Sequence, residues 1–132
     1  TALRLLERRR MRQVLVVDDQ ADARRLIRRL LEAHGAYEVC EASGASQALE
    51  VLGRRPMDLI ILDLMMPETD GFYLVERLKR DEALREVPII VVTAKELTRK
   101  EWQRLSGKIN RLMVKGDFLD DELVREIDHV LS

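Results

Sequence analysis

Cysteine and long apolar runs are scarce in this sequence of 132 residues, and each shortage excludes a class of protein. Cys40 is the only cysteine, so the chain can form no internal disulfide and we expect it to belong to a reducing compartment, the cytoplasm. No apolar run approaches the roughly 20 residues that cross a bilayer, and no signal-peptide pattern opens the chain. We therefore expect a soluble protein without a membrane span.

Histidine is equally rare, and its placement does not indicate a metal site. His34 and His129 fall near the ends of expected helices, without an acidic or cysteine partner at the spacing of metal ligands. We interpret both as surface residues and Cys40 as a small buried hydrophobic residue.

The chain also lacks an excess of charge of one sign. Its 23 lysines and arginines against 24 acidic residues give a net charge of −1, which predicts neither nucleic acid nor an anionic membrane as a partner. The charge is unevenly placed, because residues 1–13 hold five arginines and one glutamate and carry +4 while the remainder carries −5. We interpret these residues as a linker or helical extension and residues 14–132 as one domain. Because the first residue is Thr1 and not methionine, we expect a piece of a longer protein.

Five short apolar runs alternate with amphipathic stretches along the rest of the chain. The predicted strands are residues 14–17, 37–42, 59–62, 89–92 and 109–114. The run at 37–42 is the least apolar, so we place it near a sheet edge. Thr98 and Glu101 have the spacing of a capping box, which predicts a helix from there to about Gly107.

The first predicted helix shows the clearest amphipathic period and ends at Gly35. The residues predicted to face the core are Ala23, Leu26, Ile27, Leu30 and Leu31. The opposite face, interpreted as solvated and without function, carries Arg24, Arg25, Arg28 and Arg29.

This alternation predicts a doubly wound α/β fold, with a five-stranded parallel sheet of order 2-1-3-4-5 and five helices on its two faces. Ligands of such sheets bind at the carboxyl ends of the strands, where the strand order reverses. The stretch DLIILDLMMPETDG, residues 58–71, places Asp63 at such a point, because the apolar run 59–62 ends there and the turn residues Pro67, Asp70 and Gly71 follow.

Four of the five strands end in polar groups, namely Asp18-Asp19, Asp63, Thr93 and Lys115. Carboxylates that converge at one edge repel each other, and a divalent cation relieves the repulsion. Hard oxygen ligands that leave room for water and phosphate are typical of Mg²⁺. The set therefore suits phosphoryl transfer, with Asp63 as the nucleophile that forms an aspartyl phosphate, Lys115 neutralising phosphoryl oxygens and Thr93 donating a hydrogen bond.

Each of these residues has a simpler interpretation when taken alone. An acidic pair after a strand often caps the next helix, a threonine often ends a strand, and a lysine before a glycine is usually solvated. The conjunction of all four at one edge favours the phosphoryl site. Met65 and Met66 are interpreted as loop packing, since a thioether is too soft a ligand for Mg²⁺.

With these residues identified, the chain from Val14 to Leu131 resembles the receiver domain of two-component response regulators. The motifs that carry the resemblance are VLVVDDQ, LIILDLMMPETDG, PIIVVTA and the strand that ends at Lys115. The resemblance implies a flavodoxin-like fold and a phosphoryl group donated by a histidine kinase or a histidine phosphotransfer domain. The implied Mg²⁺ ligands are Asp18, Asp19, Asp63 and the backbone carbonyl of Met65, and the implied phosphoryl-binding residues are Thr93 and Lys115.

The resemblance also leads to expectations about single segments and positions. The segments TAKELTRKEW, GKI and VKG look like receivers attached to hybrid sensor histidine kinases. Gly116 stands where many receivers have proline, and Leu112 stands where many have an aromatic residue that moves with the threonine. Met65 and Lys95 occupy the positions that tune phosphoryl lifetime in the family.

Phosphorylation is expected to act on the face formed by the helix from Thr98, the strand 109–114 and the last helix, which then binds another domain or a second copy. We expect no enzymatic activity beyond the domain's own phosphoryl transfer and no direct binding of nucleic acid. The alternatives are an interaction module that works without phosphorylation and a Mg²⁺-dependent phosphohydrolase. Two features disfavour the phosphohydrolase. Met65 occupies the position where such an enzyme is expected to carry a general acid, and the chain is too short to include a cap domain.

Overall fold

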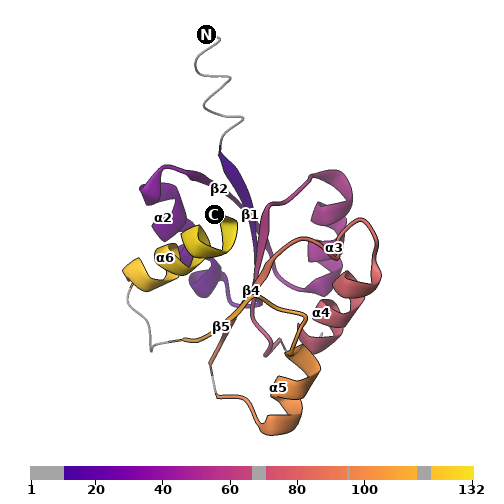
Figure 1. Ribbon diagram of the computed structural model, residues 1–132. Helices are drawn as coiled ribbons and strands as arrows, with labels where there is room; N and C mark the ends of the chain where they lie inside the picture. The colour runs from indigo at the N-terminus through magenta and orange to yellow at the C-terminus, as the bar shows by residue number, and fades with distance from the viewer. Residues whose placement is uncertain (1–10, 67–70, 95, 116–119) are drawn as a thin grey trace.

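The computed structural model describes residues 11–66, 71–94, 96–115 and 120–132, and its five strands form one parallel sheet of order β2-β1-β3-β4-β5 (Figure 1). The strands are β1 Arg12–Val17, β2 Tyr37–Ala42, β3 Leu59–Leu62, β4 Ile89–Thr93 and β5 Arg111–Val114. The predicted fold class and strand order are confirmed, and β2 is an edge strand as its lower hydrophobicity predicted.

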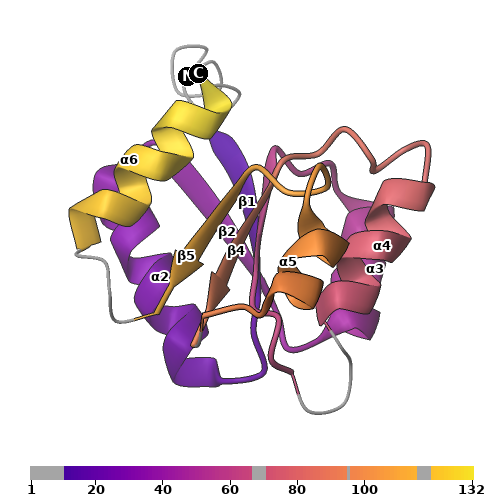
Figure 2. The ribbon, with the colours of Figure 1, turned by 60° about the horizontal axis from the view of Figure 1, so that its bottom comes forward.

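Helices cover both faces of this sheet. They are α2 Ala21–His34, α3 Ala45–Arg54, α4 Gly71–Arg80, α5 Arg99–Leu105 and α6 Asp120–Leu131. Helices α2 and α6 lie on one face, and α3, α4 and α5 lie on the other (Figures 1 and 2). Within the described ranges, no helix combines the length and the hydrophobicity that crossing a bilayer requires.

Local sequence signals set the helix ends. Helix α2 ends at Gly35, whose φ of 87° lies in the left-handed region that glycine adopts without strain. Helix α5 begins after Thr98, whose hydroxyl accepts from the Glu101 N–H while the Glu101 carboxylate accepts from the Thr98 N–H. The predicted capping box is therefore confirmed, and it fixes where the chain turns after β4.

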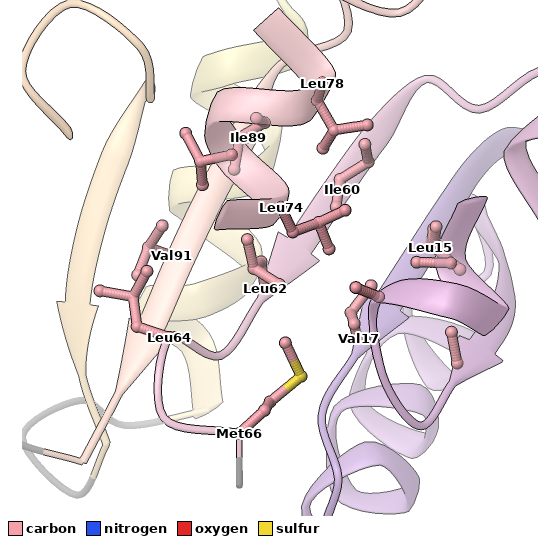
Figure 3. Packing of buried hydrophobic residues seen from close by; sticks show 14 of the residues in the cluster. Leu15, Val17, Ile60, Leu62, Leu64, Met66, Leu74, Leu78, Ile89 and Val91 are labelled. Carbon is pink, nitrogen blue, oxygen red and sulfur yellow. The ribbon is translucent and has the colours of Figure 1, made fainter. Parts of the chain in front are cut away.

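The core consists of two apolar layers, one on each face, because successive strand residues point to opposite sides of the sheet. In β1, Val14 and Val16 pack under α2 and α6, whereas Leu15 and Val17 pack under the other three helices. Figure 3 shows the second layer, in which side chains of α4 lie against those of β3 and β4. The central strands β3 and β4 are buried on both faces, which explains their continuous apolar sequences.

The bounds of three strands and one core assignment differ from the sequence predictions. β4 extends one residue beyond its predicted end, to Thr93. β1 begins at Arg12 and not at Val14, because its first two residues pair with β2. β5 begins at Arg111 and not at residue 109, and the preceding Asn110 forms hydrogen bonds with the backbone of Ile89. The prediction that Leu26 faces the core is wrong, since this residue is 57% exposed while Leu31 is fully buried. The buried stripe of α2 is narrow, and Leu26 lies beyond its edge.

Some predictions concern residues outside the described ranges. They involve most of the arginine-rich segment 1–13, the turn residues Pro67 and Asp70, and the positions of Lys95 and Gly116. The division of the chain at residue 13 stays a prediction.

The contrast between the two leucines of α2 can be measured. We expect Leu31→Ala to lower the free energy of unfolding by about 2–5 kcal/mol, because it leaves a cavity between α2 and the sheet. We expect the matched Leu26→Ala to change it by less than about 0.5 kcal/mol. Urea denaturation of both variants tests this. Equal losses of unfolding free energy would contradict the difference in burial between Leu31 and Leu26.

Candidate functional site

The acidic residues of the site are brought together by strand pairing. β1 and β3 are parallel neighbours with Val17 opposite Leu62, and the Asp63 N–H donates to the Val17 carbonyl at 3.0 Å. The chain therefore leaves both strands at the same level of the sheet edge. Carboxylate oxygens of Asp18, Asp19 and Asp63 all lie within 4.8 Å of one another, as the prediction of convergence required.

The three acids differ in exposure. Asp18 and Asp63 are 2% and 6% exposed, whereas Asp19 is open to solvent. One carboxylate oxygen of Asp18 accepts from the Gln20 N–H at 2.9 Å, and one of Asp63 accepts from the Met65 N–H at 3.0 Å. These backbone bonds hold two carboxylates in place, and the third, on Asp19, is accessible from solvent.

Lys115 lies between the two buried acids. Its Nζ donates to Asp18 Oδ2 at 2.7 Å and to Asp63 Oδ2 at 3.1 Å, and its backbone N–H donates to the Thr93 carbonyl at 2.6 Å. Burial lowers the pKa of Lys115, but the bonds to both carboxylates outweigh burial, so its pKa lies above the ordinary value. The lysine therefore remains charged and compensates part of the acidic charge.

The pKa of Asp63 lies above its ordinary value. Burial is the largest cause, and the negative charge of Asp18 adds to it, while the hydrogen bonds from Met65 and Lys115 act in the opposite direction. Lys115 alone thus does not fully stabilise the ionised form of this carboxylate. A carboxylate in such a position gains from further positive charge nearby.

Thr93, at the end of β4, is fully buried, and its Oγ1 has no hydrogen-bond partner among the residues that the structure describes. A buried hydroxyl without a partner costs about 1–3 kcal/mol, so such groups are rare unless a ligand satisfies them. The predicted role of Thr93 as a hydrogen-bond donor to a ligand is consistent with this unsatisfied hydroxyl.

The residues present fit a hard divalent cation. Three carboxylates supply only oxygen donors, and Asp19 keeps the cluster open to solvent. Met65 is 44% exposed and lies beside the cluster, since its N–H donates to Asp63. Its backbone carbonyl as a fourth ligand stays a prediction, as do the assigned roles of the other site residues.

Sequence reasoning missed two residues that shape the site. Gly71 begins α4, where an added Cβ would lie 2.5 Å from the Leu64 Cα and 2.7 Å from the Asp63 carbonyl oxygen. Arg24 was assigned to a solvated face, but its side chain is only 17% exposed and bonds the Asp18 carbonyl. The Asp-Gly pair at 70–71 marked a turn without showing this close approach, and the spacing of the arginines did not distinguish Arg24 from its neighbours.

Comparison with known families agrees with this geometry. Residues 14–128 match the response regulator receiver domain. The chain belongs to this family. The family comprises signalling domains of two-component systems, and the resemblance stated from the motifs is confirmed.

Individual relatives support the same conclusion. The phosphate regulon transcriptional regulatory protein PhoB of Pseudomonas aeruginosa is 42% identical over 118 residues, which are 89% of this chain and 51% of PhoB. The response regulator PleD of Caulobacter vibrioides is 34% identical over 120 residues, 90% of this chain and 24% of PleD. The receiver thus spans about half of PhoB and about a quarter of PleD.

The fold matches solved receivers too. The structure of the chemotaxis protein CheY4 of Vibrio cholerae superposes with a TM-score of 0.83 at 29% identity, over 92% of this chain and 99% of CheY4. The finer expectation of a hybrid sensor kinase is not confirmed by these similarities and stays a prediction.

The close approach at Gly71 has a measurable effect. We expect Gly71→Ala to lower the free energy of unfolding by about 1–3 kcal/mol, because the Cβ overlaps backbone atoms that cannot rotate away. The matched control is Gly53→Ala in α3, where nothing lies within 4 Å of an added Cβ and helix propensity predicts a gain of about 0.5–1 kcal/mol. If chemical denaturation shows a higher free energy of unfolding for both variants than for the wild type, the close contact at Gly71 is contradicted.

The raised pKa of Asp63 predicts a pH-dependent effect on stability. As pH rises through the unfolded-state pKa toward the higher folded-state pKa, the unfolded chain releases its proton first, so stability falls and stays lower above both values. Asp63→Asn cannot ionise and escapes this loss. We expect the variant to be more stable than the wild type at neutral pH without metal, and the difference to vanish at acid pH.

Thermal unfolding in a chelating buffer across this pH range measures the effect. A variant that is less stable than the wild type at neutral pH would show that Lys115 compensates Asp63 fully.

Proposed function

We propose that this receiver accepts a phosphoryl group on Asp63 in a Mg²⁺-dependent reaction, from a histidine kinase or a histidine phosphotransfer domain. The observation that carries the proposal is the convergence of three carboxylates, a lysine and an unsatisfied threonine hydroxyl at one sheet edge. Membership of the receiver family supports it.

The proposed step is an in-line displacement at phosphorus. A carboxylate oxygen of Asp63 attacks the phosphorus of a phosphohistidine, the O–P bond forms and the P–N bond breaks. The bond's electron pair goes to the imidazole nitrogen, which takes up a proton from solvent. The Met65 N–H and Lys115 hold the carboxylate in position for this attack.

Asp18, Asp19 and Asp63, with the Met65 carbonyl, would hold Mg²⁺, which supplies charge neutralisation at the phosphoryl oxygens when bound. Lys115 would then move from its bond with Asp18 to a phosphoryl oxygen. The Thr93 hydroxyl would donate to another, which satisfies the buried group. Thr93 is the last residue of β4 and Lys115 directly follows β5, so their movement would be passed to the face formed by α5, β5 and α6.

That face would bind a second copy or another domain of the parent protein. Leu112, at the position where many receivers carry a switching aromatic residue, is partly buried and packs against the core. We propose that Thr93 and Lys115 carry the switch and that Leu112 follows by repacking. We also propose a cytoplasmic protein in which residues 1–13 link the receiver to another segment, and in which the receiver itself does not bind nucleic acid.

The test is a titration of Mg²⁺ together with beryllofluoride, which mimics the phosphoryl group on an aspartate. Trp102 on α5 is 46% exposed and reports changes there by fluorescence, and light scattering reports the mass. We expect saturable, Mg²⁺-dependent binding that Asp63→Asn abolishes.

The outcomes separate the possible functions. An increase in mass on binding would identify self-association as the output, and an unchanged mass would indicate another domain. No binding at millimolar Mg²⁺ would overturn the proposal in favour of an interaction module that works without phosphorylation. Turnover of a small phosphoester would indicate a phosphohydrolase.

A further inference from the structure

Arg24 of α2 differs from the other arginines of its helix in what it bonds. Its Nη1 donates to the backbone carbonyl of Asp18 at 2.7 Å, and its Nε donates to Glu41 Oε1 at 3.1 Å. Arg25, the next residue, is mostly exposed and lies 4.0 Å from Asp22. Arg24 therefore joins the end of β1 to β2, whereas its neighbour faces solvent.

Glu41 is a fixed anchor for this contact. Its second oxygen, Oε2, accepts from Arg28 Nη1 at 2.9 Å, and Arg28 also bonds Glu32 at 2.8 Å. Burial raises the pKa of Glu41, but the hydrogen bonds from Arg28 and Arg24 outweigh it and bring the pKa below the ordinary value. Glu41 thus stays ionised at neutral pH and holds the guanidinium of Arg24 in one place.

The consequence is that both backbone groups of Asp18 are fixed. Its N–H donates to the carbonyl of Ala42 on β2 at 3.1 Å, and its carbonyl accepts from Arg24. The Arg24 N–H also donates to the carbonyl of Gln20, the N-cap residue of α2, at 3.2 Å, so the helix begins directly after the turn that follows β1. The orientation of the Asp18 and Asp19 carboxylates depends on this turn, because both lie within it.

We propose that Arg24 is a positioning residue of the acidic site: with Glu41 it holds the turn at Asp18 in the geometry that binds a divalent cation. This inference rests on the proposed Mg²⁺-dependent function. Within the described part of the chain, the guanidinium bonds the backbone carbonyl of Asp18 and none of the three site carboxylates, so its effect passes through the backbone of Asp18. Residues that orient metal ligands typically contribute 10–100-fold to metal affinity.

Arginine is specifically suited to this position. Its planar guanidinium presents several N–H groups in a rigid fork, so it bonds the Asp18 carbonyl and Glu41 at the same time. A lysine would bring the same charge but would present a single nitrogen on a flexible stem. The Arg24→Lys variant therefore separates the effect of geometry from that of charge.

Calorimetric titration with MgCl₂ alone tests the proposal, at a temperature where circular dichroism shows each variant folded. We expect Arg24→Met to weaken Mg²⁺ binding by about 10–100-fold, with a smaller loss for Arg24→Lys and Glu41→Gln. The matched control Arg25→Met should bind like the wild type. If Arg24→Met does not fold, the Mg²⁺ affinities of Arg24→Lys and Glu41→Gln decide between a positioning role and none.

Each outcome has one meaning. Wild-type affinity in Arg24→Met would overturn the positioning role. Full affinity in Arg24→Lys together with a loss in Arg24→Met would assign the effect to charge and overturn it as well. A wild-type protein that binds no Mg²⁺ would instead overturn the proposed function on which the inference rests.

Discussion

The mutual repulsion of carboxylates at the carboxyl edge of the sheet is the constraint on which the rest of the site depends. Parallel pairing of β1 with β3 forces Asp18 and Asp63 into proximity, and burial removes the water that would screen them. Lys115 reduces the repulsion through its bonds to both acids, yet the pKa of Asp63 remains raised. The site is therefore incompletely compensated without a further cation. In the proposed function this residual imbalance would favour the binding of a divalent ion, and it would couple occupancy of the site to the position of the lysine.

The surrounding fold keeps the charged groups of the site in place although their charge is not fully compensated. Two apolar layers bury β3 and β4 on both faces, so the strand ends that carry Asp63 and Thr93 emerge directly from the close-packed core. The contact of Gly71 with the backbone at Leu64 fixes the loop after β3 from one side, and the bond of Arg24 to the Asp18 carbonyl fixes the loop after β1 from the other. Such support keeps the groups of a site near their working geometry.

Much of this could be predicted from the sequence, because the signals were local and periodic. Apolar runs with β-branched residues located the strands, and the polar residues at the ends of four of these runs located the site edge. What could not be predicted depends on three-dimensional contacts. The exposure of Leu26 depends on the width of the interface under α2, the close approach at Gly71 involves backbone seven residues away, and the bond of Arg24 requires β2 to place Glu41 beside it. A periodic pattern predicts which face of a helix is apolar. It does not predict which polar residue at the edge of that face bonds another part of the chain.

The buried hydroxyl of Thr93 has a consequence for how such a sequence can change. Valine has nearly the same shape and no polar atom, so it would fill the same space without leaving a group unsatisfied. The resting protein would be more stable with valine at this position. Selection for stability alone would thus favour valine, and the destabilising effect of the threonine is one that its proposed bond to a phosphoryl group would relieve.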